Sequence, residues 1–205
     1  MLKFCIYAVV LAVIIGGVAG LLHLYKVGQK NKTEMTQYEQ NIDYTGNLGK
    51  VLVVYYSMTF HTREIADMIA SATNAHIYEI KPKTAYSSPS VYMKSKKELE
   101  KQQYPALQGE LPNIEDYDIV FVGGPVWWYT MATPLYSFLE NVDFKGKKVV
   151  PFSTQGSNAG TFYADFVKMA QNADIQKYES FNNLSDAYQT SVRNKVHRWL
   201  NELAE

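Results

Sequence analysis

Apolar positions follow two different periods along most of the chain. Continuous β-branched and aromatic runs, typical of strands buried on both faces, predict strands over 50–56, 76–81, 117–123, 148–153 and 174–181. Apolar residues at helical spacing predict helices over 62–73, 133–140, 162–171 and 185–203. Strands that alternate with helices form right-handed βαβ units. The sequence therefore predicts an α/β fold with a doubly wound, five-stranded parallel sheet.

The N-terminal segment has a third pattern, because residues 4–22 contain no charged side chain. As a helix these 19 residues would span about 28 Å, close to the hydrocarbon thickness of a bilayer. We therefore predict an anchor over residues 1–26 that crosses the cell membrane once. A cleaved signal peptide is the alternative, since Gly17, Val18 and Ala19 are small residues at a cleavage-like position. Lysines on both sides of the run leave the side of the membrane undetermined.

Two further stretches are mostly polar. Residues 27–48 show no clear apolar period and are predicted to be a linker before a folded domain over 49–205. Residues 84–113 carry four clustered lysines, and Glu98 and Glu100 are interleaved with them. We interpret this second stretch as a solvated helix face. The lysines are Lys94, Lys96, Lys97 and Lys101.

Composition and charge exclude several functions. Twenty basic and twenty acidic residues give a formal net charge of zero, so nucleic-acid binding has little electrostatic support. The only cysteine, Cys5, lies in the N-terminal apolar run, which leaves the predicted domain without a thiol. The four histidines have no metal-ligand spacing, so no metal site is predicted.

Ligands of doubly wound sheets bind outside the carboxyl ends of the strands, so the loops after the first, third and fourth predicted strands are the candidate site. The first loop is rich in hydroxyls and leads directly into a helix, whose N-terminus favours negative charge. It contains no lysine, which excludes the phosphate loop of nucleotide hydrolases. A monophosphate held by neutral donors fits this loop, and a plain helix cap is the alternative. Its residues are Ser57, Met58, Thr59, Phe60, His61 and Thr62.

The second and third loops differ in character. Gly123 and Gly124 let the backbone approach a ligand closely, and three large aromatic residues follow them. Such residues at the end of a strand favour stacking on a flat ligand, and a core aromatic cluster is the alternative. The small polar third loop offers donors for the edge of a heterocycle, or is an ordinary loop. The candidate residues are Pro125, Val126, Trp127, Trp128, Tyr129, Thr130, Thr154, Gln155, Gly156 and Ser157.

These three loops resemble those of the flavodoxin superfamily over residues 50–203. Ser57 to Thr62 is similar to its S/T-x-S/T-G-N-T phosphate loop. Gly123 to Trp128 is similar to its G-x-P-x-W-W element, and Thr154 to Ser157 to its T-x-G-S/G segment.

The resemblance implies a strand order of 2-1-3-4-5 and FMN as the cofactor. It places the phosphate in the first loop and the isoalloxazine ring against the other two. It further implies that the protein carries electrons or hydride to a redox partner protein or a small-molecule acceptor. Both an NAD(P)H:quinone reductase and a non-enzymatic electron carrier are open.

Three residues depart from the family pattern. Phe60 stands where glycine is usual, His61 where asparagine is usual, and Tyr129 where a small residue follows the second tryptophan. If position 60 needs a positive φ, phenylalanine would be strained by about 1 kcal/mol. Tyr129 would narrow the slot for the flavin. A cofactor-free scaffold or binding module tethered to the membrane is therefore the alternative function.

Overall fold

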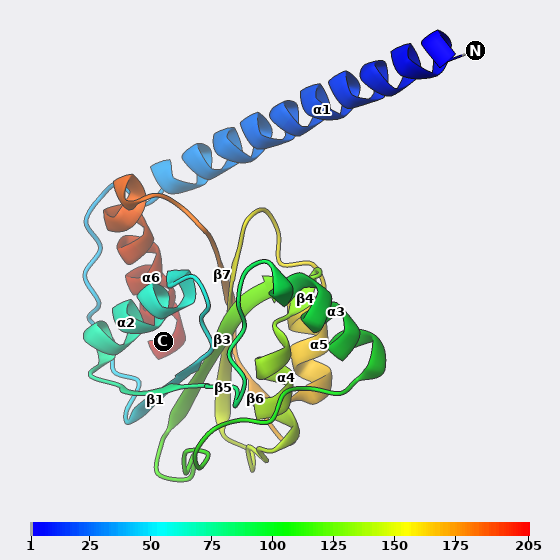
Figure 1. Ribbon diagram of the computed structural model, residues 1–205. Coiled ribbons are helices and arrows are strands. Elements are labelled where there is room, and N and C mark those ends of the chain that lie inside the picture. The colour runs from blue at the N-terminus through cyan, green and yellow to red at the C-terminus, as the bar shows by residue number, and fades with distance from the viewer. Residues whose placement is uncertain (1) are drawn as a thin grey trace.

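The computed structural model describes residues 2–205, with the side chains of residue 7 and of 10–205. A parallel sheet is covered by helices on both faces (Figure 1). The helices are α1 (Leu2–Thr36), α2 (His61–Thr73), α3 (Ser90–Lys101), α4 (Thr133–Glu140), α5 (Phe162–Met169) and α6 (Gln189–Ala204), with a 3-10 turn η1 (Asp186–Tyr188) before α6. The strands are β1 (Val51–Tyr55), β2 (His76–Glu79), β3 (Ile119–Trp127), β4 (Thr130–Met131), β5 (Lys148–Gln155), β6 (Asp174–Ile175) and β7 (Glu179–Asn182).

The strand order β2-β1-β3-β5-β6 confirms the predicted doubly wound topology. The fifth predicted strand is divided into β6 and β7, and both pair in parallel with β5. The pairing is interrupted between them, although the Gln176 amide still donates to the Val149 carbonyl at 2.8 Å. Strand β3 continues past its predicted end at Gly123 and turns back as the short antiparallel strand β4.

Two apolar layers hold the helices on the sheet. On one face, α2 and α6 pack on β1 and β3, and the Phe121 ring meets the Trp199 ring edge to face at 5.4 Å. On the other face, α4 packs on β3 and α5 packs on β5. Gly123 permits the tight centre of the sheet, because a Cβ there would lie 2.2 Å from the Phe152 ring. This packing fixes the carboxyl ends of β1, β3 and β5 relative to one another.

Helix α1 continues to Thr36, ten residues beyond the expected anchor, so the first part of the expected linker is helical. The end of α1 is held by the domain: the Lys195 ammonium donates to Glu34 at 2.6 Å, and the Asn182 amide donates to Asn31 at 2.7 Å. Met35 is buried at this junction. These contacts join residues more than 150 positions apart, which is why local polarity indicated a linker instead.

Residues 37–45, which connect α1 to the rest of the domain, also lie along α6. The side-chain amide of Asn194 donates to the carbonyls of Tyr38 and Gln40, at 2.8 and 2.9 Å. Asn201 accepts from the amide of Thr45 at 2.9 Å. Residues 37–45 are therefore fastened to the domain along their length.

Helix α1 is long and apolar enough to cross a membrane. The 27 residues Val10–Thr36 contain a window of mean hydropathy 1.9, and no other described residue covers this window. Figure 1 shows α1 (blue) leaving the domain beside α6, on the side where the parallel strands have their carboxyl ends. Cys5 falls among the residues whose side chains lie outside the description.

Candidate functional site

A cavity of about 570 Å³ opens at the carboxyl ends of β1, β3 and β5. The three predicted loops meet there. The candidate residues that line it are Met58, Thr59, Pro125, Val126, Trp127, Trp128, Tyr129, Thr154, Gln155, Gly156 and Ser157. Its size is within the range of small-molecule and cofactor sites. Ser57, Phe60, His61, Thr62 and Thr130 lie around the cavity without lining it.

The first loop ends in an uncapped helix N-terminus. The first intrahelical bond of α2 runs from the Glu64 amide to the Phe60 carbonyl at 2.9 Å, so the amides of residues 61–63 have no acceptor within the helix. No side chain caps this end. The hydroxyl oxygen of Ser57 is buried and has no hydrogen-bond partner. Donors without acceptors at a helix N-terminus form a cradle for an anion.

Position 60 does require a positive φ. Phe60 is the N-cap of α2 at φ 69°, the left-handed region in which a bulky side chain is strained. The residue is 61% exposed, and the centre of its ring lies 5.2 Å from the Arg63 guanidinium. The side chain therefore points away from the core.

The next two residues of α2 have different surroundings. Thr62 is buried, and its hydroxyl lies 2.7 Å from that of Thr154, which links the first loop to the third. His61 faces a separate small hollow and has its ring 4.0 Å from Glu64. Thr62 thus positions the site, and His61 lies outside the cavity.

The second loop places two tryptophans differently. Trp127 is half-buried, with its ring edge to face against Tyr56 at 5.5 Å and against Tyr86 at 5.1 Å. Trp128 and Tyr129 form the reversal from β3 to β4 at φ 53° and 63°, and both are exposed. Trp127 therefore forms a fixed wall of the cavity, while Trp128 and Tyr129 form its rim.

A half-buried carboxylate stabilises the wall behind Trp127. Glu98 accepts hydrogen bonds from the Tyr86 hydroxyl at 2.5 Å and from Thr133 at 2.7 Å. Burial, with the hydrogen bond to Glu98, raises the pKa of Tyr86 far above its ordinary value, so the phenol stays protonated. The phenol ring is thereby held against Trp127.

The rim is tied to the third loop through Asp165. Its carboxylate accepts from the hydroxyls of Thr130 at 2.6 Å and Thr161 at 2.5 Å. Burial raises the pKa of Asp165, but these two hydroxyls together with the Lys168 ammonium hold the pKa below its ordinary value. The Thr161 amide also donates to the Tyr129 carbonyl at 2.6 Å. The Thr130 hydroxyl thus supports the turn through Asp165.

Residues 50–203 match the flavodoxin family, which covers most of the chain. The chain belongs to the flavodoxin family. Among solved structures it is similar to a protein of Bacteroides eggerthii designated a flavoprotein, with 29% identity over 77% of this chain and 99% of that one, and a TM-score of 0.63. A Bacteroides uniformis protein with the same designation shares 29% identity over 74% and 97%, also at 0.63.

A more distant structure shows the same fold. It is a flavoprotein of Lactobacillus acidophilus in complex with FMN, with 20% identity over 64% of this chain and 93% of that one, and a TM-score of 0.59. No curated protein matches the chain. The family and the fold predicted from the sequence are confirmed.

Part of this flavodoxin's cavity comes from helix α3, which the sequence did not indicate. The Trp128 indole donates to Ser95 at 3.1 Å, and the Tyr92 ring meets the Trp128 ring edge to face at 6.1 Å. Val91 and Ser95 are one helical turn apart and face inward, a weak spacing signal in a polar stretch. The lining residues not predicted are Ser88, Val91, Tyr92, Ser95, Asn158 and Asn183.

The third loop is held by hydrogen bonds behind it. Ser153 donates to the Gln155 side chain at 2.9 Å and lies 2.8 Å from the Tyr163 hydroxyl. The Gln155 amide donates to Asn182 at 3.3 Å. These bonds fix the side chain of Gln155 at the cavity floor.

The cavity of this flavodoxin is neutral. Within residues 2–205, no carboxylate, imidazole, ammonium, guanidinium or thiol lines it. No three histidine, cysteine, aspartate or glutamate side chains of the described residues are grouped to hold a metal ion. The chain thus offers the cavity walls, hydroxyls and amides, and no strong acid or base.

Proposed function

We propose that this flavodoxin binds FMN and carries electrons or hydride in a redox reaction at the membrane surface. The observation that carries the proposal is the convergence of the three loops on one aromatic cavity next to an uncapped helix N-terminus. FMN is the cofactor that the family indicates, and the Lactobacillus acidophilus relative is an FMN complex.

The residues present fit FMN. The orphaned Ser57 hydroxyl and the free amides of α2 would hold its phosphate, since they are donors that lack acceptors in the protein itself. Trp127 and Trp128 offer flat apolar surface for the ring. Gln155 and Ser157 offer hydrogen-bonding groups for its polar edge. When bound, FMN supplies the redox chemistry, and the protein sets its access and electronics.

The neutral lining favours electron transfer over acid–base chemistry. No described residue that lines the cavity has a carboxylate or imidazole, the groups that most often transfer protons near neutral pH. A site without a cation also disfavours a negatively charged reduced cofactor, which lowers the reduction potential. These two properties support a low-potential electron carrier.

The membrane location rests on α1. Its length and apolar composition suit a single span, and no described domain residue covers the apolar window. Because α1 ends in contacts with α6 and β7, the span would hold the domain at the bilayer surface.

The cofactor can be tested on the full chain in detergent micelles. The protein is incubated with FMN, desalted and examined for a flavin absorption band. Retained flavin supports the proposal, and a folded but colourless protein would favour the cofactor-free module instead.

The serine of the first loop gives a sharper test. Ser57→Ala is expected to weaken FMN about 10- to 100-fold, as for the loss of one hydrogen bond to a charged group. Riboflavin, which lacks the phosphate, should bind both forms equally. Ser87→Ala, which removes an exposed hydroxyl outside the cavity, is the matched control. An equal loss of both ligands would contradict the assignment of the phosphate to this loop.

Enzyme and carrier are separable by adding NADH to the flavin-loaded protein. Oxidation of NADH without a second protein identifies a reductase. Reduction only by a chemical donor or a partner protein identifies a carrier, which is the outcome that the neutral cavity favours.

A further inference from the structure

We propose that the face formed by α3 and the β3–β4 turn docks on an anionic lipid surface, so that the cavity opens against the bilayer. The docking face is defined by Tyr92, Met93, Lys96, Lys97, Trp128 and Tyr129. The proposal builds on the membrane-surface location argued above, and it does not require that flavin be bound.

Four residues of this face expose large apolar side chains. The exposed fractions are 64% for Tyr92, 65% for Met93, 45% for Trp128 and 69% for Tyr129. Three of the four also line the cavity, so the apolar patch is the rim of its opening. Aromatic residues next to lysines are the composition of membrane interfaces.

The charge of α3 complements an anionic bilayer. The helix carries four lysines and two glutamates, and one of these, Glu98, is turned inward with its side chain 13% exposed. The Lys96 ammonium lies 5.6 Å from the centre of the Trp128 ring. Within the described residues, Lys97 forms no ion pair. Positive charge and aromatic surface thus share one face.

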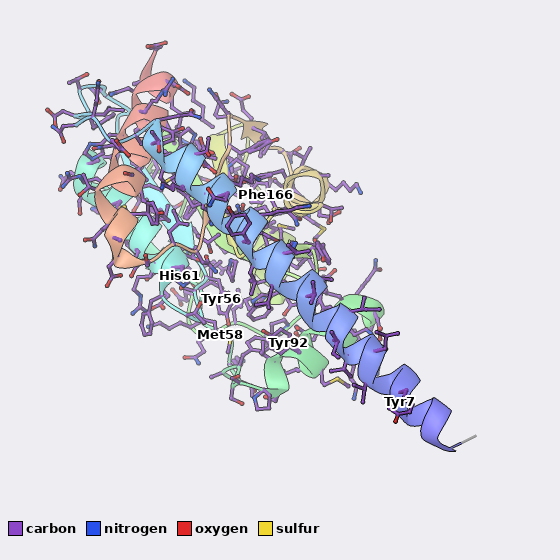
Figure 2. All side chains as sticks on the ribbon, turned by 90° about the horizontal axis from the view of Figure 1, so that it is seen from above. Tyr7, Tyr56, Met58, His61, Tyr92 and Phe166 are labelled. Atoms are coloured by element: carbon purple, nitrogen blue, oxygen red, sulfur yellow. The ribbon has the colours of Figure 1, made fainter. Side chains whose placement is uncertain are left out.

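The geometry of α1 brings this face toward the membrane. Only six residues, a rise of about 10 Å of helix, lie between Leu24, the last of the closely spaced leucines, and Asn31, which is hydrogen-bonded to the domain. In Figure 1, α3 lies on the side toward which α1 rises. In Figure 2, Tyr92 lies on the same side as Tyr7, away from the end of α1 held by the domain. Both views place α3 toward the membrane-spanning half of α1.

The fixed junction makes this orientation persistent. Lys195 is buried between Glu34 of α1 and Glu179 of β7, at 2.6 and 3.3 Å. A buried and doubly paired ammonium resists separation, because each carboxylate would otherwise lose its counter-charge. The domain is therefore presented to the bilayer with one face rather than at random.

The test uses the full chain in lipid vesicles. Cys5→Ser removes the only cysteine, and Met93→Cys or Glu140→Cys then carries a fluorescent label. Glu140 is exposed at the end of α4, at the opposite edge of the sheet. Quenchers attached to lipid should quench the label at 93 in vesicles containing phosphatidylglycerol and much less in phosphatidylcholine alone. The label at 140 should not be quenched in either.

Removing positive charge from the docking face provides a second test. Lys96→Gln with Lys97→Gln should lower the ratio of docked to undocked protein about thirtyfold, which corresponds to about 1 kcal/mol per lysine. Lys145→Gln with Lys147→Gln, at the opposite edge, should leave the quenching at 93 unchanged.

Three outcomes would overturn the proposal. The first is no quenching of the label at 93 in anionic vesicles, and the second is equal quenching of the labels at 93 and 140. The third is quenching at 93 that depends on the amount of protein per vesicle and not on lipid charge, which would indicate that a second copy of the protein covers this face. Flavin absorbance measured on the same samples reports the proposed function separately, so either idea can fail alone.

Discussion

The left-handed backbone at Phe60 allows a prediction of magnitude and sign. A side chain with a Cβ in this region costs roughly 1–2 kcal/mol, which glycine avoids. Glycine also has more conformational entropy in the unfolded chain, which lowers its stability advantage over alanine by about 0.4–1 kcal/mol. Phe60→Gly is therefore expected to be about 1 kcal/mol more stable than Phe60→Ala. Both variants lack the ring and its contact with Arg63, so the difference reports the backbone alone.

The wild-type protein should lie between these variants. The exposed ring contributes about 0.5–1 kcal/mol through its cation–π contact with Arg63, which alanine loses. Urea unfolding of the full chain in micelles measures the three free energies of unfolding. Tryptophan fluorescence is the signal, since all three tryptophans lie in the domain.

A helical position supplies the opposite control. Ser71 is exposed within α2, where glycine costs about 1 kcal/mol relative to alanine. Ser71→Ala should therefore be more stable than Ser71→Gly, the reverse of the order at position 60. If glycine and alanine at position 60 are equally stable, or follow the order at Ser71, the left-handed conformation does not exist and the reasoning is wrong.

Three other outcomes are expected. Lys195→Met should lower the free energy of unfolding by about 3–5 kcal/mol, seen in urea titrations, because two carboxylates lose their counter-charge; a loss below 1 kcal/mol would contradict its burial. Asp165→Asn should cost about 1–2 kcal/mol near pH 7. Since the folded-state pKa of Asp165 is lowered, this cost should vanish as the pH falls below about 4, and a cost independent of pH would refute the ionised state. Ser157→Lys should raise the potential of bound flavin by tens of millivolts in redox titrations, whereas Ser157→Gln should not, because only a cation stabilises a negative reduced form in a neutral cavity; equal shifts would refute this.

The sequence predicted the parts of the fold that depend on local pattern. Apolar runs located β1, β2, β3 and β5, and helical spacing located α2, α4, α5 and α6. The family resemblance, in which glycine is usual at position 60, had raised a positive φ there as a condition, and Phe60 has φ 69°. Local pattern is informative in these places because each segment buries its apolar side chains on the element next to it.

The parts that were not predicted depend on contacts between distant segments. Glu34 and Asn31 look like linker residues until Lys195 and Asn182 are brought to them by the fold. The sequence of α3 is mostly polar because most of the helix is exposed to solvent. Only one side of it contacts Trp128, through Ser95. Such roles depend on which polar groups meet in space, which periodicity does not report.

The continuity of α1 from the apolar segment into its contacts with α6 has a consequence for how a partner is found. A flexible tether would let the domain sample a wide volume, at a low effective concentration for any one target. With the proposed anchoring, a rigid helix would instead hold the candidate site at one height above the bilayer, and lateral diffusion would leave it only a two-dimensional search. Partners that diffuse in the same plane would meet the site often, and partners in bulk solution would have to come to it.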